Sequence, residues 1–429
     1  MKARTTLLLI CLAAAGLTAY AQDEVYLKVT SPGLTRVMIA MPDFPVRPGA
    51  EAGAAATVLA MLRQDLNETA VIGLIPPENA KLVVADPANP TLTRQRWRAV
   101  GAQFLLDGTI SGAGNQVVLD VRLWDLTSGE TAYSRRLQGA APLAGTIAHT
   151  LANELVHLFT GRSGPFLSRI AFISDRSGAK EVWLMRWDGS DAQQLTSHRS
   201  IALGPAWSPD GEWLAFTSFM RGNPQLFILR PTEGYLKALS TLPGVNSSPS
   251  FSPDGKTIAF AAGANGTTDV YVVPAAGGTP ERLTHTLGIS TQPAWSPNGR
   301  QIVFTSSVGG APQLYVMDAE GSNVRRLTFD DKFADEAAWA PDGVRIAYTT
   351  LVEDHFQIAI LDLRGDTRTI VAGPGNNESP CWSPDGTVLA FVSDRTGLRQ
   401  IFITDPNGRP RQITTEGNNI QPAWIAHVQ

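Results

Sequence analysis

The chain has 429 residues, of which 43% are hydrophobic and 17% charged, and its formal net charge is −4. This length exceeds that of one small domain and allows two. Mild acidity and scattered Lys and Arg argue against a large basic surface, and therefore against nucleic acid or anionic lipid as partners.

Residues 1–21 have the pattern of a secretory signal peptide. Lys2 and Arg4 precede an apolar run from Leu7 to Leu17, and Ala19-Tyr20-Ala21 offers small residues for cleavage. The run is too short for a stable transmembrane helix, so we expect no direct membrane insertion. Cleavage would leave Cys381 as the one cysteine, which excludes an internal disulfide. An exported protein without disulfides favours a bacterial periplasm.

Residues 22–160 lack any repeat and predict a small α/β domain. Val58, Leu62 and Leu66 lie four apart on one face of a predicted helix. The expected elements are a strand over 35–41, a helix over 54–66, a helix over 94–102, a hairpin of 104–110 and 116–124, a strand over 131–137, and a helix over 147–158. The linker of residues 161–165 is short, so we expect this domain to pack on the C-terminal region.

Residues 161–429 carry a short pattern that recurs six times. Five copies have an aromatic residue followed by a tight turn, as in Trp295-Ser296-Pro297-Asn298-Gly299, and the sixth ends at Trp424. The aromatic residues occur at positions 207, 251, 295, 339, 382 and 424, at intervals of 42 to 44 residues. A repeat of this length with several short strands is typical of a β-propeller.

Each repeat predicts four antiparallel strands. In one repeat these are residues 293–295, 301–306, 313–318 and 325–328, separated by turns rich in Pro, Gly, Asn and Ser. The fourth strand is the most charged, which protects an outer sheet edge from aggregation. The aromatic row is expected to pack between neighbouring blades.

The first and last repeats are each incomplete. Ile170-Ala171-Phe172 has no aromatic strand before it, and Trp424 has no strand after it. The simplest solution pairs the two. The sequence therefore predicts a two-domain protein, with an N-terminal α/β domain followed by a six-bladed β-propeller that the C-terminal strand closes.

No catalytic or metal-binding arrangement emerges from the motifs. The chain has no Gly-x-Ser-x-Gly elbow, its six histidines do not cluster, and Glu154-x-x-His157 has no second copy. Asp175 and Asp394 recur in Ser-Asp-Arg segments that we interpret as turns. We therefore predict no catalytic residues, no metal ligands and no cofactor.

The segments that precede the inner strands are the best candidates for a binding site. In a propeller these segments converge on the mouth of the central channel, and polar loops on a rigid scaffold suit a peptide or a protein epitope. Ordinary solvated loops would have the same composition. The candidate partner-binding residues are Leu203, Asn246, Ser247, Ser248, Ser290, Thr291, Gln292, Asp335, Glu336, Asn377, Glu378, Asn419 and Gln421.

The whole arrangement resembles the TolB family of the periplasmic Tol–Pal system. The likeness rests on the signal, the α/β domain, residues 155–161 leading into 168–174, and the repeated turns. It implies a monomeric, non-enzymatic scaffold that supports outer-membrane integrity and cell division.

The same resemblance implies two partners. A Pal-type lipoprotein would bind at the loops named above, and a TolA-type inner-membrane protein would bind the mature N-terminal segment. That segment contains Asp23, Glu24, Val25, Tyr26 and Leu27. Family structures sometimes hold calcium in the channel, for which Asp335, Glu336 and Glu378 would supply oxygens.

Two other functions remain open at this stage. An enzyme acting on cell-wall glycan would need two facing carboxyl groups, for which Asp335, Glu336 and Glu378 are the candidates. A small-ligand sensor would use the N-terminal domain as its output.

Overall fold

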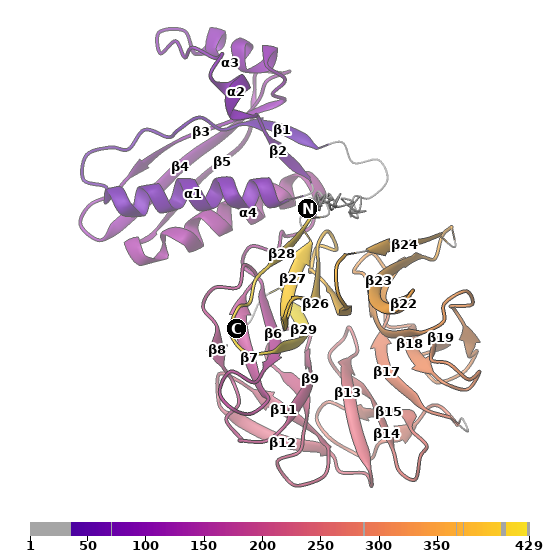
Figure 1. Cartoon of the computed structure of the whole chain (residues 1–429). Coiled ribbons are helices and arrows are strands. Elements are labelled where there is room, and N and C mark those ends of the chain that lie inside the picture. The colour runs from indigo at the N-terminus through magenta and orange to yellow at the C-terminus, as the bar shows by residue number, and fades with distance from the viewer. Residues whose placement is uncertain are drawn as a thin grey trace, which may run out of the picture.

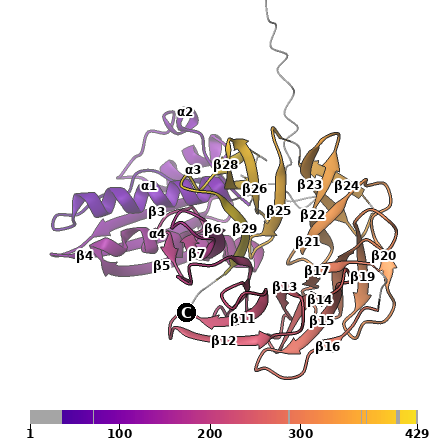
Figure 2. The same cartoon turned by 60° about the horizontal axis from the view of Figure 1, so that its bottom comes forward.

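The computed structural model describes residues 36–69, 71–285, 288–365, 367–371, 373–404 and 409–426. The expected signal peptide (residues 1–21) and the partner segment Asp23–Leu27 lie outside these residues. Figure 1 shows an α/β domain beside a ring of sheets, and Figure 2 shows the same arrangement turned by 60°.

The N-terminal domain contains one five-stranded sheet in the order β2-β1-β3-β4-β5. The strands are β1 (Val37–Ala40), β2 (Ile72–Leu74), β3 (Phe104–Ser111), β4 (Gln116–Asp125) and β5 (Thr131–Ala140). The helices are α1 (Ala52–Glu68), α2 (Pro77–Ala80), α3 (Pro90–Ala99), the 3-10 turn η1 (Ala141–Leu143) and α4 (Ala144–Thr160).

The two long helices of this domain cover one face of the sheet. α1 buries Val58, Leu62 and Leu66, as their spacing predicted, and α4 buries Leu151 and Leu155 on the same core. α2 and α3 pack on the opposite face near β1, so most of that face is left uncovered. The domain is therefore two-layered over β4 and β5.

The propeller consists of six four-stranded antiparallel sheets. Blade 1 contains β9 (Ala202–Trp207), β10 (Leu214–Ser218), β11 (Gln225–Arg230) and β12 (Tyr235–Ser240). Blade 2 contains β13 (Val245–Phe251), β14 (Thr257–Gly263), β15 (Asp269–Pro274) and β16 (Glu281–Arg282). Blade 3 contains β17 (Ser290–Trp295), β18 (Gln301–Ser306), β19 (Gln313–Asp318) and β20 (Arg325–Arg326).

The remaining blades have the same pattern. Blade 4 contains β21 (Ala334–Trp339), β22 (Arg345–Val352), β23 (His355–Asp362) and β24 (Thr367–Val371). Blade 5 contains β25 (Asn377–Trp382), β26 (Leu389–Thr396), β27 (Leu398–Thr404) and β28 (Pro410–Gln412). Blade 6 contains β29 (Asn419–Ile425), β6 (Arg169–Ser174), β7 (Glu181–Arg186) and β8 (Gln193–Gln194).

Blade 6 is built from both ends of the propeller sequence. β29 pairs antiparallel with β6, with Trp424 opposite Ile170 and Asn419 opposite Ser174. The predicted closure by the C-terminal strand is therefore confirmed. Closure removes the two free sheet edges that an open row of blades would present.

The repeated turn after each inner strand is stabilised by its own side chains. In blade 2 the Ser252 hydroxyl donates to Asp254 at 2.6 Å and accepts from the Thr257 N–H at 3.0 Å. Gly255 has φ +71°, a left-handed conformation that glycine adopts without a Cβ clash. We call the end of the propeller that carries these turns the turn face, and the opposite end, where the inner strands begin, the rim.

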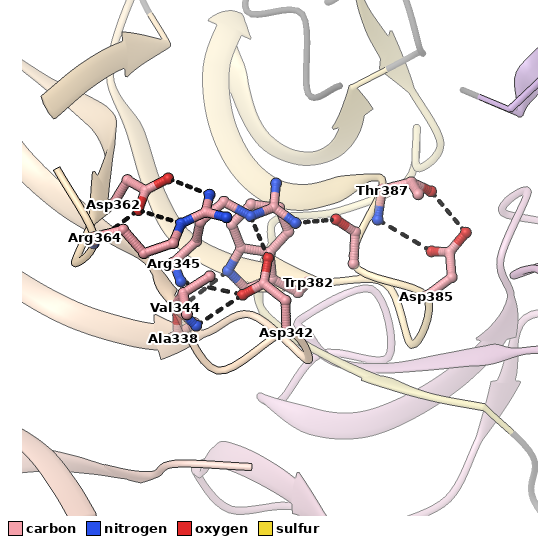
Figure 3. Close-up of polar contacts among 10 residues, drawn as sticks. Ala338, Asp342, Val344, Arg345, Asp362, Arg364, Trp382, Asp385 and Thr387 are labelled. Atoms are coloured by element: carbon pink, nitrogen blue, oxygen red, sulfur yellow. Dashed lines mark hydrogen bonds and ion pairs between the residues drawn. The ribbon is translucent and has the colours of Figure 1, made fainter. Parts of the chain in front are cut away.

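The turn face also links neighbouring blades. Arg345 of blade 4 donates to Asp342 in its own turn at 2.5 Å and to the Gly386 carbonyl of blade 5 at 2.8 Å. Its guanidinium lies 4.6 Å from the ring centroid of Trp382 (Figure 3). The indole N–H of Trp382 in turn donates to the Ala338 carbonyl of blade 4 at 3.2 Å. Trp382 thus packs between blades, as the aromatic row predicted.

The N-terminal domain packs against blades 5 and 6 at the turn face. One apolar cluster joins α1 and α4 to propeller residues that include Phe166, Trp187 and Ile403. Glu68 at the end of α1 accepts from Arg411 of β28 at 2.9 Å. The rim is therefore at the other end of the propeller from the domain interface.

Within the described residues, none of the helices combines the length and the apolar character needed to cross a bilayer.

Deleting residues 418–429 should reopen the ring. The deletion removes β29 and exposes the apolar surface that Trp424 and Ile425 cover. We expect a loss of several kcal/mol, on the order of that expected for exposing two or three large apolar side chains. Urea unfolding measures this loss, and a chain lacking only residues 427–429, which keeps β29, is the control. Unchanged melting of the longer deletion would contradict closure.

A buried acid beneath the domain interface should give stability a defined pH dependence. Asp65 and His149 are both buried, with Nδ1 and Oδ2 2.7 Å apart. Burial raises the pKa of Asp65 to about 6, while His149 opposes the shift. Between pH 4 and 6 the native state thus keeps a proton that the unfolded chain has lost, so this group's contribution to stability falls as the pH rises.

Asp65→Asn removes this titration. The free energy of unfolding of the variant, relative to the native sequence, should rise by roughly 1–3 kcal/mol from pH 4 to pH 7. Urea titrations at several pH values measure the difference. Asp43→Asn, at a side chain that is 84% exposed, controls for the loss of one aspartate. Parallel profiles for Asp65→Asn and the native sequence would rule out this role.

Candidate functional site

The six inner strands surround a central channel, and each strand bends at the same place. Every inner strand has a register shift against its neighbour, and the residue three positions before the aromatic adopts φ between 51° and 56°. The cavity that these strands enclose has a volume of about 330 Å³. The six left-handed residues are Gly204, Ser248, Gln292, Glu336, Ser379 and Gln421.

The sequence explains the bend as a β-bulge. In blade 2, Ser247 pairs with Ala261 and Ser250 pairs with Ala259, so Ser248 and Pro249 lie opposite one residue. A proline cannot donate to the sheet, and it follows the left-handed residue in five of the six strands. The bulge therefore brings a polar side chain to the channel in five blades, and Gly204 takes that place in blade 1.

Several of these channel residues hold adjacent blades together. The side-chain carbonyl of Gln421 accepts from the Gly204 N–H at 2.8 Å, which links blade 6 to blade 1. The Glu336 carboxylate accepts from the N–H and the hydroxyl of Ser379 at 2.7 and 2.8 Å, which links blade 4 to blade 5. The thiol sulfur of Cys381 accepts a hydrogen bond from the backbone N–H of Trp424 at 3.1 Å. The channel lining is thus part of the scaffold.

The structure corrects part of the predicted partner surface. Asn246, Ser290, Asn377 and Asn419 lie at or next to the first residue of their strands, but they are at most 1% exposed. The Asn419 amide donates to Gln400 at 2.8 Å and to the Glu416 carbonyl at 3.0 Å, so it fixes a loop. These four side chains are therefore unable to contact a partner at the rim in this structure.

The other predicted residues are half-buried around the channel mouth. They are Leu203, Ser247, Ser248, Thr291, Gln292, Asp335, Glu336, Glu378 and Gln421. Burial raises the pKa of Asp335 above its usual value, and the nearby Thr305 hydroxyl opposes this rise. Burial also raises the pKa of Glu378, against the opposing charge of Arg399 at 3.5 Å.

The acids at the channel do not fit a calcium site. The Glu336 oxygens already accept from Thr349 and Ser379, and Glu378 faces Arg399. Within the described residues, no three His, Cys, Asp or Glu side chains are grouped closely enough to hold a metal ion. The calcium expectation for Asp335, Glu336 and Glu378 is therefore not supported. The same hydrogen bonds occupy the Glu336 carboxylate, so it is poorly placed to act as a general acid or base.

Sequence reasoning missed an apolar patch on the rim. Large apolar side chains that are 40–69% exposed extend over the loops of blades 1 to 4. We call them the rim patch: Ile201, Val245, Ile289, Val308 and Phe329. Three of them stand six residues before the repeat aromatic, a periodic signal that was available in the sequence. Exposed apolar side chains that recur at one end of a rigid ring offer an interaction surface.

Blades 5 and 6 carry hydrogen-bonded polar residues at the rim, beside the exposed apolar side chain of Leu398 in blade 5. Asn376 and Asn418 occupy the position equivalent to Ile201. Asp394 accepts from the backbone and side-chain amides of Asn376 at 2.7 and 2.8 Å, and Asp175 does the same for Asn418 at 2.7 and 2.9 Å. The Ser-Asp-Arg segments thus connect a hairpin to the neighbouring inner-strand loop, a role wider than that of a turn.

Comparison with known proteins agrees with this architecture. A model of the TolB beta propeller domain matches residues 156–428, and one of the TolB amino-terminal domain matches residues 25–132. The chain is 33% identical over 223 residues to the Tol-Pal system protein TolB of Desulfosudis oleivorans, covering 50% of this chain and 49% of that protein. It is 32% identical over 200 residues to a protein TolB homolog of Chlorobium chlorochromatii, and the alignment covers 46% of this chain and 45% of that protein.

These alignments span about half the length of the curated relatives that the chain matches. A solved structure extends the likeness to nearly the whole chain. TolB from Acinetobacter baumannii superposes with a TM-score of 0.78 at 26% identity, over 91% of this chain and 96% of that one. With both domains matched in the same order, the chain belongs to the TolB family.

Proposed function

We propose that the protein is a non-enzymatic periplasmic scaffold of the Tol–Pal system that binds a Pal-type lipoprotein at the propeller rim. The observation that carries this proposal is the rim patch, which presents exposed apolar side chains on a ring held rigid by hydrogen bonds between blades. The Tol-Pal names of the relatives support the assignment to this system. The signal pattern of residues 1–21 supports export to the periplasm.

A protein partner suits this site better than a small ligand. The rim patch extends over four blades, whereas a small molecule binds in a concave pocket that buries most of its surface. The polar groups of the channel below are engaged with one another. A folded domain has the size to cover apolar residues spread over several blades and to meet the polar side chains beside them.

We also propose that the segment beginning at Asp23 contacts a TolA-type protein, and that the scaffold supports outer-membrane integrity and cell division. Family membership supports both statements. The segment lies outside the described residues, so its proposed role rests on the sequence resemblance.

A test of rim binding should use side chains that are not part of the scaffold. Glu336 and Gln421 are unsuitable because their removal would break contacts between blades. Val308 and Val324 form a matched pair, since both belong to blade 3 and are 54% and 51% exposed. Val308 follows β18 at the rim, whereas Val324 precedes β20 at the turn face.

We expect Val308→Asp to weaken binding of the purified periplasmic domain of the Pal-type lipoprotein at least tenfold. A buried charge at an apolar contact is costly, and tenfold corresponds to about 1.4 kcal/mol. Val324→Asp should leave the affinity unchanged. Calorimetric titration measures both, and circular dichroism checks the fold. Equal affinities for the two variants would refute the rim site.

A further inference from the structure

The strand β5 forms a long free edge on the N-terminal domain. It has ten residues and pairs with β4 alone among the described strands. A free edge presents a row of unpaired backbone N–H and C=O groups, which can pair with an added strand. β5 contains no proline that would prevent such pairing.

An apolar groove lies beside Tyr133 of this edge, on the side of α4. Its volume is about 480 Å³, and its walls include Tyr133, Thr150, His157, Leu158 and Leu167. Leu158 is 42% exposed although it lies on the helix that builds the core. The groove therefore offers apolar contact that no described part of the chain covers fully.

A second groove crosses β3, β4 and β5 on the uncovered face of the sheet and reaches the same edge. Its volume is about 810 Å³, and it is lined by Arg47, Asp107, Asp120, Arg122 and Arg136, among others. Asp107 accepts from the Trp124 indole at 3.1 Å, and burial raises the pKa of this carboxyl. Arg136 lies 3.4 Å from Asp120 and its side chain is still 64% exposed. The arginines outnumber the acids, so the groove favours anionic groups.

The side chains of β5 alternate between these two grooves. Tyr133 and Arg135 both contact Glu154 of α4, on the apolar side. Ser134 and Arg136 lie opposite Arg122 and Asp120 of β4, on the arginine side. A strand added to β5 would have the same two-residue period, because neighbouring strands share the orientation of their paired side chains.

We propose that the free edge of β5 binds an extended segment of a partner protein in which apolar and acidic residues alternate. The partner backbone would extend the sheet, its apolar side chains would enter the groove beside Leu158, and its acidic side chains would meet Arg122 and Arg136. Main-chain hydrogen bonds give affinity in this mode, and the alternate pockets give specificity. The surface is independent of the rim, because it lies on the other domain.

The position of the apolar groove gives this site access to the domain linker. Ser163 and Leu167, between α4 and the propeller, belong to its lining. A bound segment would therefore touch the N-terminal domain and the connection to the propeller at once.

A synthetic peptide tests the proposal on the whole protein. The probe is a fluorescein-labelled ten-residue peptide of alternating valine and glutamate, compared with a scrambled peptide of equal composition. By fluorescence anisotropy, we expect the alternating peptide to bind at least tenfold more tightly. Hydrogen exchange should show new protection in the amides of β5.

Two substitutions examine the two grooves separately. Arg136→Glu and Leu158→Asp should each weaken binding at least tenfold, since both side chains are exposed and remote from the core. Arg364→Glu, at an exposed arginine of the propeller, should have no effect. Equal binding of the scrambled peptide, no binding of either peptide, or indifference to both substitutions would overturn the proposal.

Discussion

The propeller depends on one antiparallel pairing, between β29 at the C-terminus and β6 at the start of the repeats. This pairing joins segments about 250 residues apart and converts a row of sheets into a ring. Bringing two such distant segments together lowers the conformational entropy of the chain, which opposes folding. The apolar surface that all six blades bury on packing offsets this single cost. The contact of Gln421 with Gly204, between blades 6 and 1, can form only when the ring is shut.

The same constraint explains the strained backbone around the channel. Five non-glycine residues adopt left-handed conformations there, at a cost of roughly 1 kcal/mol or more each. The bulges that contain them direct polar groups toward the neighbouring blade, where Glu336 and Gln421 find backbone donors. The strained residues thus help to hold the ring together, and Glu336 is a structural group of the channel.

The sequence predicted the blades closely because their turns carry specific chemistry. The strands expected over 301–306 and 313–318 are observed with those bounds as β18 and β19, since Pro, Asn and Gly fix the reversal between strands. The fourth strand, expected over 325–328, pairs only over 325–326. An outer strand pairs with a neighbour on one side only. Its amino-acid composition is therefore a weak guide to the residue at which its hydrogen-bonded pairing ends.

The candidate site was harder to predict, because a polar residue in a loop can face either way. Asn246, Asn377 and Asn419 look like solvated rim residues in the sequence, yet each is turned inward to satisfy buried backbone or side-chain groups. The apolar residues Ile201, Val245 and Ile289 were not among the predicted site residues, yet they are exposed at the rim. Orientation depends on contacts between segments that are distant in sequence, which periodicity alone does not reveal.

Blades 5 and 6 differ from blades 1 to 4 both at the turn face and at the rim. At the turn face they pack against α1 and α4 and receive the Glu68–Arg411 ion pair. At the rim Asp175 and Asp394 hold the loops before their inner strands by hydrogen bonds, at the position where blades 1 to 3 expose Ile201, Val245 and Ile289. Strands of about six residues separate these two ends by only about 20 Å. Because these strands are paired along their length, a displacement of the rim loops of blades 5 and 6 should reach the N-terminal domain, whereas the rim patch that we propose as a partner contact lies on the other four blades.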